Sequence, residues 1–211
     1  GVIVVETVGL QGQGVRTTYN ASLDIEMPDL TSYNLCNAVE KLEMEMLEGR
    51  IYDKNRPADM AKYNELRKKA LEGYFQDWLS VPLRTGIGQK HNLTFEMGTK
   101  ELNTQISVSY KNEEGVMKES FRRTLSGSAQ VTYRVKNLMF RDIAQITSNN
   151  AQNSPYGSFY EYAIMNPYTP IYDEYGKPTK QDAQNQYNYS PLYNYTTGSK
   201  SLTSYLNFTN N

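Results

Sequence analysis

The sequence predicts a mainly β fold: an antiparallel meander of about six strands, with a two-helix insert and one long loop. The first observation is a period-two alternation of apolar and polar residues, which gives a strand one apolar and one polar face. It runs through residues 15–26, 93–97, 102–110 and 125–135. The second is the shortness of the joins at 98–101 and 136–137, which fits antiparallel neighbours. The third is a change to helical spacing after Pro28.

The N-terminal part of the chain contains two different kinds of predicted strand. Residues 2–5 are a continuous apolar run, typical of a strand buried on both faces. A flexible joint follows at Gly9, Gly12 and Gly14. The next strand alternates regularly, and its run of about 11 residues is near the length that a tilted strand needs to cross a bilayer.

Two helices are expected between this strand and the meander. Pro28 ends the strand, and Asp29, Thr31 and Ser32 are candidate N-caps. Apolar residues then recur at helical spacing up to Gly49, and again over 58–71. The two apolar stripes are Leu35, Ala38, Val39, Leu42, Met46 and Leu47, and Met60, Tyr63, Leu66, Ala70 and Leu71. Acidic and basic residues are balanced here, which favours a solvated helical hairpin over a membrane-surface helix.

The connections of the meander are unequal in length. The joins at 98–101 and 136–137 are tight, whereas 111–123 is expected to be a longer, charged loop, with Glu113 and Glu114 at a solvated tip. Short turns at one end and longer loops at the other are typical of outer-membrane barrels. The strand at 138–146 is less regular, because Asp142 shares a face with apolar residues. Either Asp142 lies near a membrane rim, or a bulge shifts the register.

A long tyrosine-rich loop is predicted over 149–200, before a last strand at 202–209. Its prolines prevent long regular elements, and its aromatic content argues against plain disorder. Aromatic rings of this loop are candidates to bind sugar rings or peptides, and a self-packed loop is the equal alternative. The candidate substrate-binding residues are Tyr160, Tyr162, Tyr168, Tyr172 and Tyr175.

Composition argues against several classes of function. The net charge of −1 offers no basic surface for nucleic acid. His91 is the single histidine and Cys36 the single cysteine, so no His-centred triad or cysteine-based metal cluster can form within the chain. No apolar run is long enough for a membrane-spanning helix. We therefore expect no enzyme, no cofactor and no metal site.

Six segments in order resemble one protein family. They are GVIVVET (1–7), SYNLCNAVEKLEME (32–45), WLSVPLRTGIGQKHNL (78–93), YKNEEGVMK (110–118), YRVKNLMFR (133–141) and NSPYGSF with the following YA and NPY (153–168). Together they are similar to the SusC/RagA-type TonB-dependent outer-membrane transporters of Bacteroidetes. The chain begins at Gly1 within a strand-like run, so we interpret it as a fragment of such a protein.

The resemblance implies a plug domain inside a 22-stranded barrel. Residues 1–12 would be the last plug strand and a linker, and 13–211 the first part of the barrel, an arc of its transmembrane wall. The helical insert at 31–76 and the loop at 149–200 would be extracellular. The lumen side would carry Arg16, Asn103, Gln105, Gln130 and Arg134.

The resemblance also implies partners and a location. Such a protein takes up a glycan, oligosaccharide or peptide through the cell outer membrane, with a SusD-like surface lipoprotein as lid. The TonB complex supplies energy through a segment outside this chain, and outer-membrane lipid surrounds the barrel.

Two other readings fit the same alternation. One is a soluble carbohydrate-binding β-sandwich that uses the tyrosine-rich loop as its site. In a sandwich, Leu93, Ile106 and Val131 would be buried against a second sheet, whereas in a barrel arc they would lack such cover. The other is a self-contained small barrel, which needs about eight strands.

Overall fold

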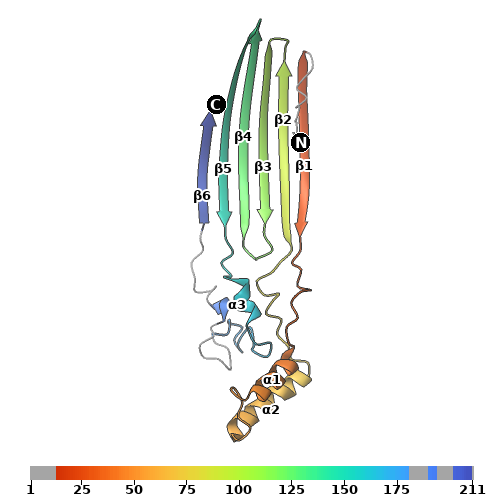
Figure 1. Cartoon of the computed structure of the whole chain (residues 1–211), viewed down its shortest axis with the longest axis vertical. Coiled ribbons are helices and arrows are strands. Elements are labelled where there is room, and N and C mark those ends of the chain that lie inside the picture. The colour runs from red at the N-terminus through yellow and green to blue at the C-terminus, as the bar shows by residue number, and fades with distance from the viewer. Residues whose placement is uncertain (1–12, 181–189, 194–201, 211) are drawn as a thin grey trace, which may run out of the picture.

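The computed structural model describes residues 13–180, 190–193 and 202–210. These residues form one six-stranded antiparallel sheet in which each strand pairs with its neighbours in sequence (Figure 1). The predicted meander is therefore confirmed. The expected strand at 2–5 lies outside the described residues, as do parts of the tyrosine-rich loop. The strands are β1 (Gly14–Glu26), β2 (Gly86–Gly98), β3 (Leu102–Glu114), β4 (Phe121–Val135), β5 (Leu138–Gln152) and β6 (Leu202–Asn210).

The strands pair in an unbroken register from β1 to β5, so residues that face each other across the sheet share a face. One row across β2 to β5 joins Thr94, Ser107, Ser128 and Gln145, and the adjacent row joins Phe95, Ile106, Ala129 and Ala144. The side-chain period of two thus places most of the polar residues on one face and most of the apolar residues on the other.

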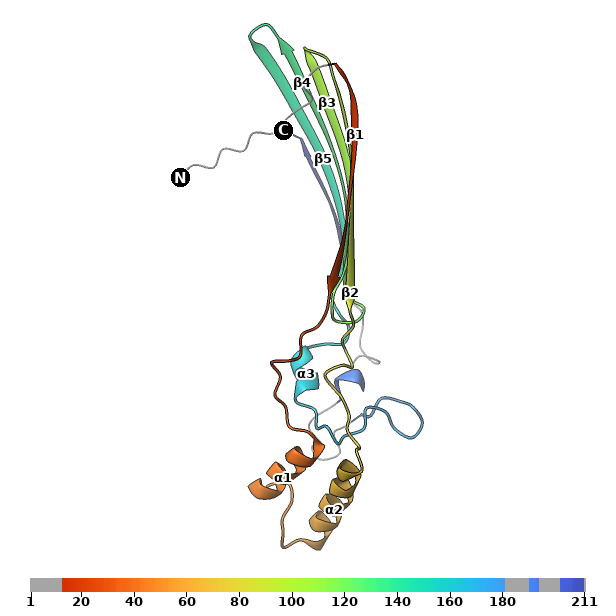
Figure 2. The ribbon, with the colours of Figure 1, turned by 90° about the vertical axis from the view of Figure 1, so that its right-hand side faces the viewer.

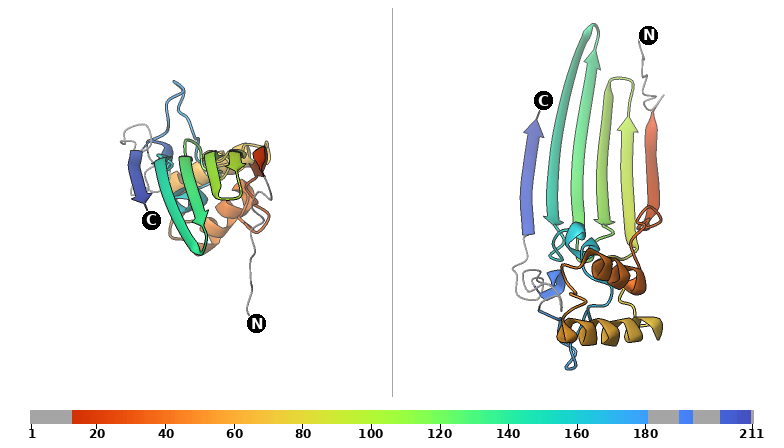
Figure 3. Two further views of the ribbon diagram at one scale, coloured as in Figure 1. Left: turned by 90° about the horizontal axis from the view of Figure 1, so that it is seen from above. Right: turned by 60° about the horizontal axis from the view of Figure 1, so that its bottom comes forward.

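The sheet is a single open layer. Figure 2 shows it edge-on as a curved layer, and the view from above in Figure 3 shows no second sheet over either face. Within the described residues, β1 and β6 are edge strands that do not pair with each other. The sandwich reading and the small-barrel reading are therefore both wrong for this part of the chain. The predicted fold class, an open arc of a barrel sheet, is confirmed.

Three strands extend further than the sequence predicts. β3 continues to Glu114, β4 begins at Phe121, and β5 continues to Gln152. The expected loop at 111–123 is therefore only residues 115–120. Glu113 and Glu114 belong to β3, where they pair with Lys111 and Arg84, rather than to a solvated tip. Polar residues occupy both faces at these strand ends, so the contrast that reveals a strand in sequence is lost there.

The predicted asymmetry of the connections holds. The tight turns at 99–101 and 136–137 lie at one end of the sheet. The connections 27–85, 115–120 and 153–201 leave from the other end, which we call the loop end (Figure 1).

Two helices, α1 (Ala38–Glu48) and α2 (Pro57–Leu71), lie beyond the loop end (Figure 3). Asn37 caps α1 through a reciprocal capping box with Glu40. The predicted N-caps Asp29, Thr31 and Ser32 are wrong, because α1 begins only at Ala38 and its N-cap is Asn37. Asp29 instead accepts hydrogen bonds from the backbone and hydroxyl of Thr31.

The buried cores lie among the connections, not in the sheet. One core packs α1 against α2 and includes Ala38, Leu42, Met46, Tyr52, Tyr63, Ala70 and Tyr168. This confirms the hairpin packed through its apolar stripes, although Leu35, Leu47 and Leu71 at the margins are exposed. A second core, built from Trp78, Tyr162 and Met165, forms around the short helix α3 (Phe159–Ala163). No helix among the described residues has the length and apolar character needed to cross a membrane.

Candidate functional site

The polar face of the sheet gathers the residues that the sequence predicts for a water-filled side. Arg16 pairs in register with Glu96, and the same row continues on the next two strands with Gln105 and Gln130. Asn103 and Arg134 lie on the same face, closer to the turns. All five predicted residues therefore share one face.

Hydrogen bonds between strands hold this face in one arrangement. The Arg16 Nε atom donates to Glu96 Oε2 at 2.6 Å. Arg141 donates to Gln130 at 2.8 Å, and the hydroxyls of Ser107 and Ser128 lie 2.7 Å apart. Most of the face carries uncharged hydroxyl and amide groups from Ser, Thr, Asn and Gln. Such groups can both donate and accept, which suits ligands rich in hydroxyl or amide groups.

The opposite face carries an exposed apolar band. Val15, Phe95, Ile106, Val131 and Ile146 are 74%, 41%, 42%, 39% and 47% exposed, respectively. The band continues onto β6 at Leu206 and Phe208. Such a broad apolar surface is unusual on a monomeric soluble protein and marks a surface for interaction.

The height of the band can be estimated along β4. Leu125 and Val135 bound it on that strand, and at about 3.3 Å per residue they lie roughly 33 Å apart. At a strand tilt of about 40°, this becomes roughly 25 Å measured along a barrel axis, close to the height of an outward-facing apolar band in transmembrane barrels.

Asp142 stands on this apolar face in regular register. It pairs with Val131, between the pairs formed by Phe140 and Ala144. No bulge shifts it, so that explanation is wrong. Its row continues to Met97 on β2, one residue before the strand ends at Gly98. This is the last row on this face before the β2–β3 turn, but on β4 and β5 the exposed apolar pairs Tyr133–Phe140 and Val135–Leu138 lie beyond it. On these two strands Asp142 therefore lies inside the apolar band, and the register alone does not place it at a rim.

His91 also lies on the apolar face, where it has a structural partner. Its Nδ1 atom is 2.6 Å from the Tyr19 hydroxyl, and the two rings stack with centroids 6.1 Å apart. This contact joins β1 to β2.

The predicted tyrosines of the long loop separate into two groups. Tyr162 and Tyr168 are buried. The Tyr162 hydroxyl donates to the Tyr156 carbonyl at 2.9 Å, and the Tyr168 hydroxyl donates to the buried Glu45 carboxylate at 2.8 Å. Tyr160, Tyr172 and Tyr175 are 68%, 54% and 84% exposed. The structure does not gather the five rings into one site, and a binding role for the exposed three stays a prediction.

Tyr172 and Tyr175 belong to a small hairpin that projects from the loop end (Figure 2). The Asp173 carboxylate accepts from the backbone N–H groups of Tyr175 and Lys177, which fixes the turn. Tyr160 lies on α3 instead.

The three connections of the loop end contact one another, which sequence reasoning missed. Trp78 Nε1, before β2, donates to the carbonyl of Thr169, after β5, at 3.1 Å. The Lys118 ammonium, between β3 and β4, donates to the Val81 carbonyl at 2.6 Å. The Lys118 carbonyl in turn accepts from the Ser154 hydroxyl at 2.8 Å. We call these connected segments the loop assembly.

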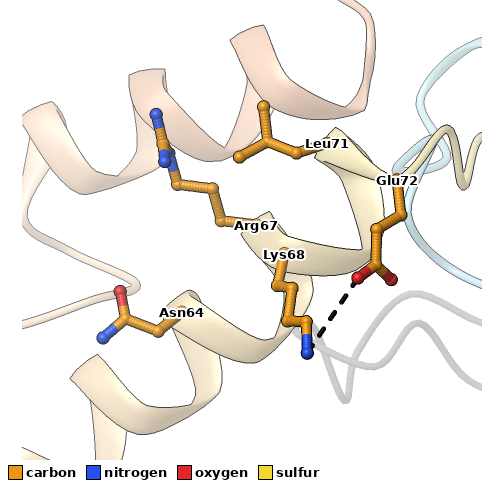
Figure 4. Close-up of a pocket in the computed structure, with 5 residues that line it drawn as sticks. All are labelled: Asn64, Arg67, Lys68, Leu71 and Glu72. Carbon is orange, nitrogen blue, oxygen red and sulfur yellow. Dashed lines mark ion pairs between the residues drawn. The ribbon is translucent and has the colours of Figure 1, made fainter.

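Two open cavities lie along α2. One, of about 350 Å³, is lined by Asn64, Arg67, Lys68, Leu71 and Glu72 (Figure 4). Lys68 and Glu72 form an ion pair at 3.9 Å there, and Arg67 pairs with Glu43 of α1 at 3.1 Å. The other, of about 570 Å³, is lined by Leu66, Lys69, Glu72, Gly73, Tyr74, Tyr168 and Pro170.

Shifts of pKa in the loop assembly keep the usual charge states at neutral pH. A hydrogen bond from Lys69 lowers the pKa of Glu65, and the same contact raises the pKa of Lys69. Burial raises the pKa of Tyr74. These three groups are therefore not tuned to exchange protons near pH 7. Within the described residues, no cluster of three or more His, Cys, Asp or Glu is placed to hold a metal ion.

Comparisons with known proteins point to one kind of transporter. No family model matches the chain. The TonB-dependent receptor SusC of Bacteroides thetaiotaomicron is 24% identical over 176 residues, which are 82% of this chain and 16% of SusC. A structure of the RagAB peptide transporter aligns with a TM-score of 0.70 at 16% identity, covering 96% of this chain and 26% of that one.

A structure of the RagAB peptide importer in the closed-closed state gives a TM-score of 0.65 at 17% identity, over 88% of this chain and 24% of that one. The chain thus spans about a sixth of the length of SusC and about a quarter of the matched RagAB chains. In sequence and in fold it matches the SusC/RagA-type TonB-dependent transporters, and the resemblance predicted from its sequence is confirmed.

Proposed function

We propose that this chain forms part of the barrel wall and the extracellular loops of a TonB-dependent transporter in the cell outer membrane. The observation that carries the proposal is that the two faces of the sheet differ: one is an exposed apolar band and the other is mostly polar. A transmembrane barrel needs this arrangement, with lipid outside and water inside. Residues 1–12 would be the last plug strand and a linker, and 13–211 the first part of the barrel.

The cargo in this proposal is a large nutrient, either an oligosaccharide or a peptide. The similar proteins are a receptor named SusC and a peptide importer, RagAB. The hydroxyl and amide groups of the polar face would offer many weak, exchangeable hydrogen bonds along the lumen, suited to passage rather than tight capture. Transport of this kind makes and breaks no covalent bond, and no catalytic residue is assigned.

The partners in this proposal are a SusD-like surface lipoprotein at the loop end and the TonB complex on the opposite side. The tight turns at 99–101 and 136–137 would face the periplasm. The loop assembly would face the cell exterior, where the exposed Tyr160, Tyr172 and Tyr175 would be available to a ligand or to the lipoprotein.

The test is fractionation and uptake in the native cell. The full-length protein should appear in the outer-membrane fraction, and deletion of its gene should abolish uptake of one labelled oligosaccharide or peptide pool. An uncoupler that collapses the proton gradient should abolish the same uptake, because TonB draws on that gradient. Recovery of the protein in the soluble fraction would contradict the proposal.

A further inference from the structure

One feature of the outward face is unused by the proposed transport function. On the loop side of the apolar band, four successive strands present polar residues on the same face: Gln89, Asn112, Arg123 and Asn150. We call these four residues the outer polar row. Directly above it, Tyr110 and Leu125 belong to the exposed apolar band. On β3 and β5 the row lies where the apolar band ends, because Glu114 and Gln152 follow it on the same face, whereas on β2 the exposed Ile87 follows.

Arg123 is held at the centre of this row. Its register partners on the two neighbouring strands are Asn112 and Asn150. Its Nε atom donates to Asn112 Oδ1 at 3.1 Å, and its guanidinium lies over the Phe121 ring, 4.4 Å from the centroid. The terminal nitrogens remain available, because no carboxylate of the described residues pairs with Arg123. An oriented guanidinium of this kind matches the geometry of a phosphate group.

Asn150 lies beside Arg123 in the row. Its Oδ1 atom is buried and finds no hydrogen-bond donor among the described residues. A buried polar atom without a partner is costly, and most such atoms in folded proteins are satisfied. As register partners, Asn150 and Arg123 have Cβ atoms roughly 5 Å apart. The buried Oδ1 atom is out of reach of a ligand on the surface, so the contact to a ligand is assigned to the exposed Arg123 guanidinium.

We propose that the outer polar row binds the phosphate-bearing headgroup of an acylated lipid through Arg123. The acyl chains would lie along the band above the row, over Leu125 and Tyr110, and the phosphate would contact Arg123. This inference rests on the proposed membrane location. It concerns the lipid-facing side of the wall and not the path of the cargo.

The neighbouring Arg122 provides a matched control. It pairs with Glu113 in register and lies on the polar face, one residue from Arg123 in sequence but on the opposite side of the sheet. Arg122→Gln therefore removes the same charge from the same strand without touching the outer polar row.

The experiment uses the full-length protein, purified in a neutral detergent. Binding of monophosphorylated lipid A and of its dephosphorylated form is measured by native mass spectrometry for the wild type, Arg123→Gln and Arg122→Gln. Loss of one charge-assisted contact is expected to weaken binding of the phosphorylated lipid by roughly tenfold. Arg123→Gln should show this loss and bind both lipids equally, whereas Arg122→Gln should behave like the wild type.

Two results would overturn the inference: no preference of the wild type for the phosphorylated lipid, or an equal loss in both variants. Displacement of the lipid by millimolar inorganic phosphate would also overturn it, because the site would then bind a free anion. Flotation with phosphatidylcholine vesicles tests membrane association separately, and so distinguishes a failure of the lipid-binding inference from a failure of the proposed function. A protein that floats but shows no lipid preference contradicts only the inference, and a protein that does not float contradicts both.

Discussion

Ile106 and Gln105 are neighbours on β3 whose side chains lie on opposite faces of the sheet. Ile106 pairs with Phe95 and Ala129 in the middle of the apolar band, and Gln105 pairs with Glu96 and Gln130 on the polar face. A single step along the strand therefore separates the proposed lipid side from the proposed water side. The same substitution at these two positions should have very different effects.

Ile106→Arg should lower the free energy of unfolding of the membrane-inserted protein by roughly 2–4 kcal/mol, because it places a charge at mid-depth in lipid. Gln105→Arg should change the same quantity by about 0–1 kcal/mol, because the added charge is solvated and lies beside Glu96. Urea titrations of the two full-length variants in vesicles, against the wild type, measure the difference. Equal losses in both variants would show that the two faces are not in different solvents.

At the scale of elements, the loop assembly depends on contacts between distant segments. The Tyr168 hydroxyl, after β5, binds the Glu45 carboxylate of α1 across 123 residues of sequence. Glu45 is buried and also lies 3.6 Å from the Lys41 ammonium. A buried carboxylate needs such donors, because its desolvation is otherwise uncompensated. This contact joins the helical insert to the tyrosine-rich loop.

Tyr168→Phe should therefore loosen the loop assembly without unfolding the sheet. Loss of a hydrogen bond to a buried charge costs about 1–3 kcal/mol, so the connection after β5 should become more sensitive to protease. Limited proteolysis of the full-length protein in detergent, followed by peptide mapping, measures the rate of cleavage. Tyr175→Phe is the control, because Tyr175 is 84% exposed. If the two variants are cleaved at equal rates, the Tyr168–Glu45 contact does not hold the assembly together.

At the scale of the whole molecule, the described residues form a wall without a covering layer. Their buried cores belong to the loop assembly, and the sheet has an exposed apolar face and two open edges. Exposed edges and apolar patches promote association in water. The sheet thus needs either lipid or further protein against its outward face.

The isolated 211-residue chain should for this reason be insoluble in water and soluble in detergent. Refolded without detergent, it should sediment as aggregate, because the apolar faces and the edges of separate copies would pair. In neutral detergent micelles it should stay in solution with a β-rich circular dichroism spectrum. A monodisperse monomer in detergent-free buffer, measured by analytical ultracentrifugation, would contradict this reading of the sheet.

Much of the sheet was predictable from residues alone. The alternation in β1 to β6 predicted the strands, and the short joins at 98–101 and 136–137 predicted antiparallel pairing. Strand ends were less predictable, since Asn112, Arg123 and Asn150 place polar groups where the apolar stripe should continue. The N-cap of α1 could have been found from sequence, because Asn37 and Glu40 form the spacing of a capping box. The sequence did not show which tyrosines of the long loop are buried and which are exposed, because burial of Tyr162 and Tyr168 depends on segments far away in the chain.

The sequence by itself determined which residues share a face, because side-chain direction in a strand follows a period of two. Only the tertiary structure decided what covers each face. It left the apolar band without a second sheet, kept Asp142 in register, and buried Trp78 against a carbonyl 91 residues away. The reason is physical. The side-chain periodicity of a strand is a local property, whereas burial depends on which distant segments contact each other. Such contacts produce no repeating pattern in the sequence.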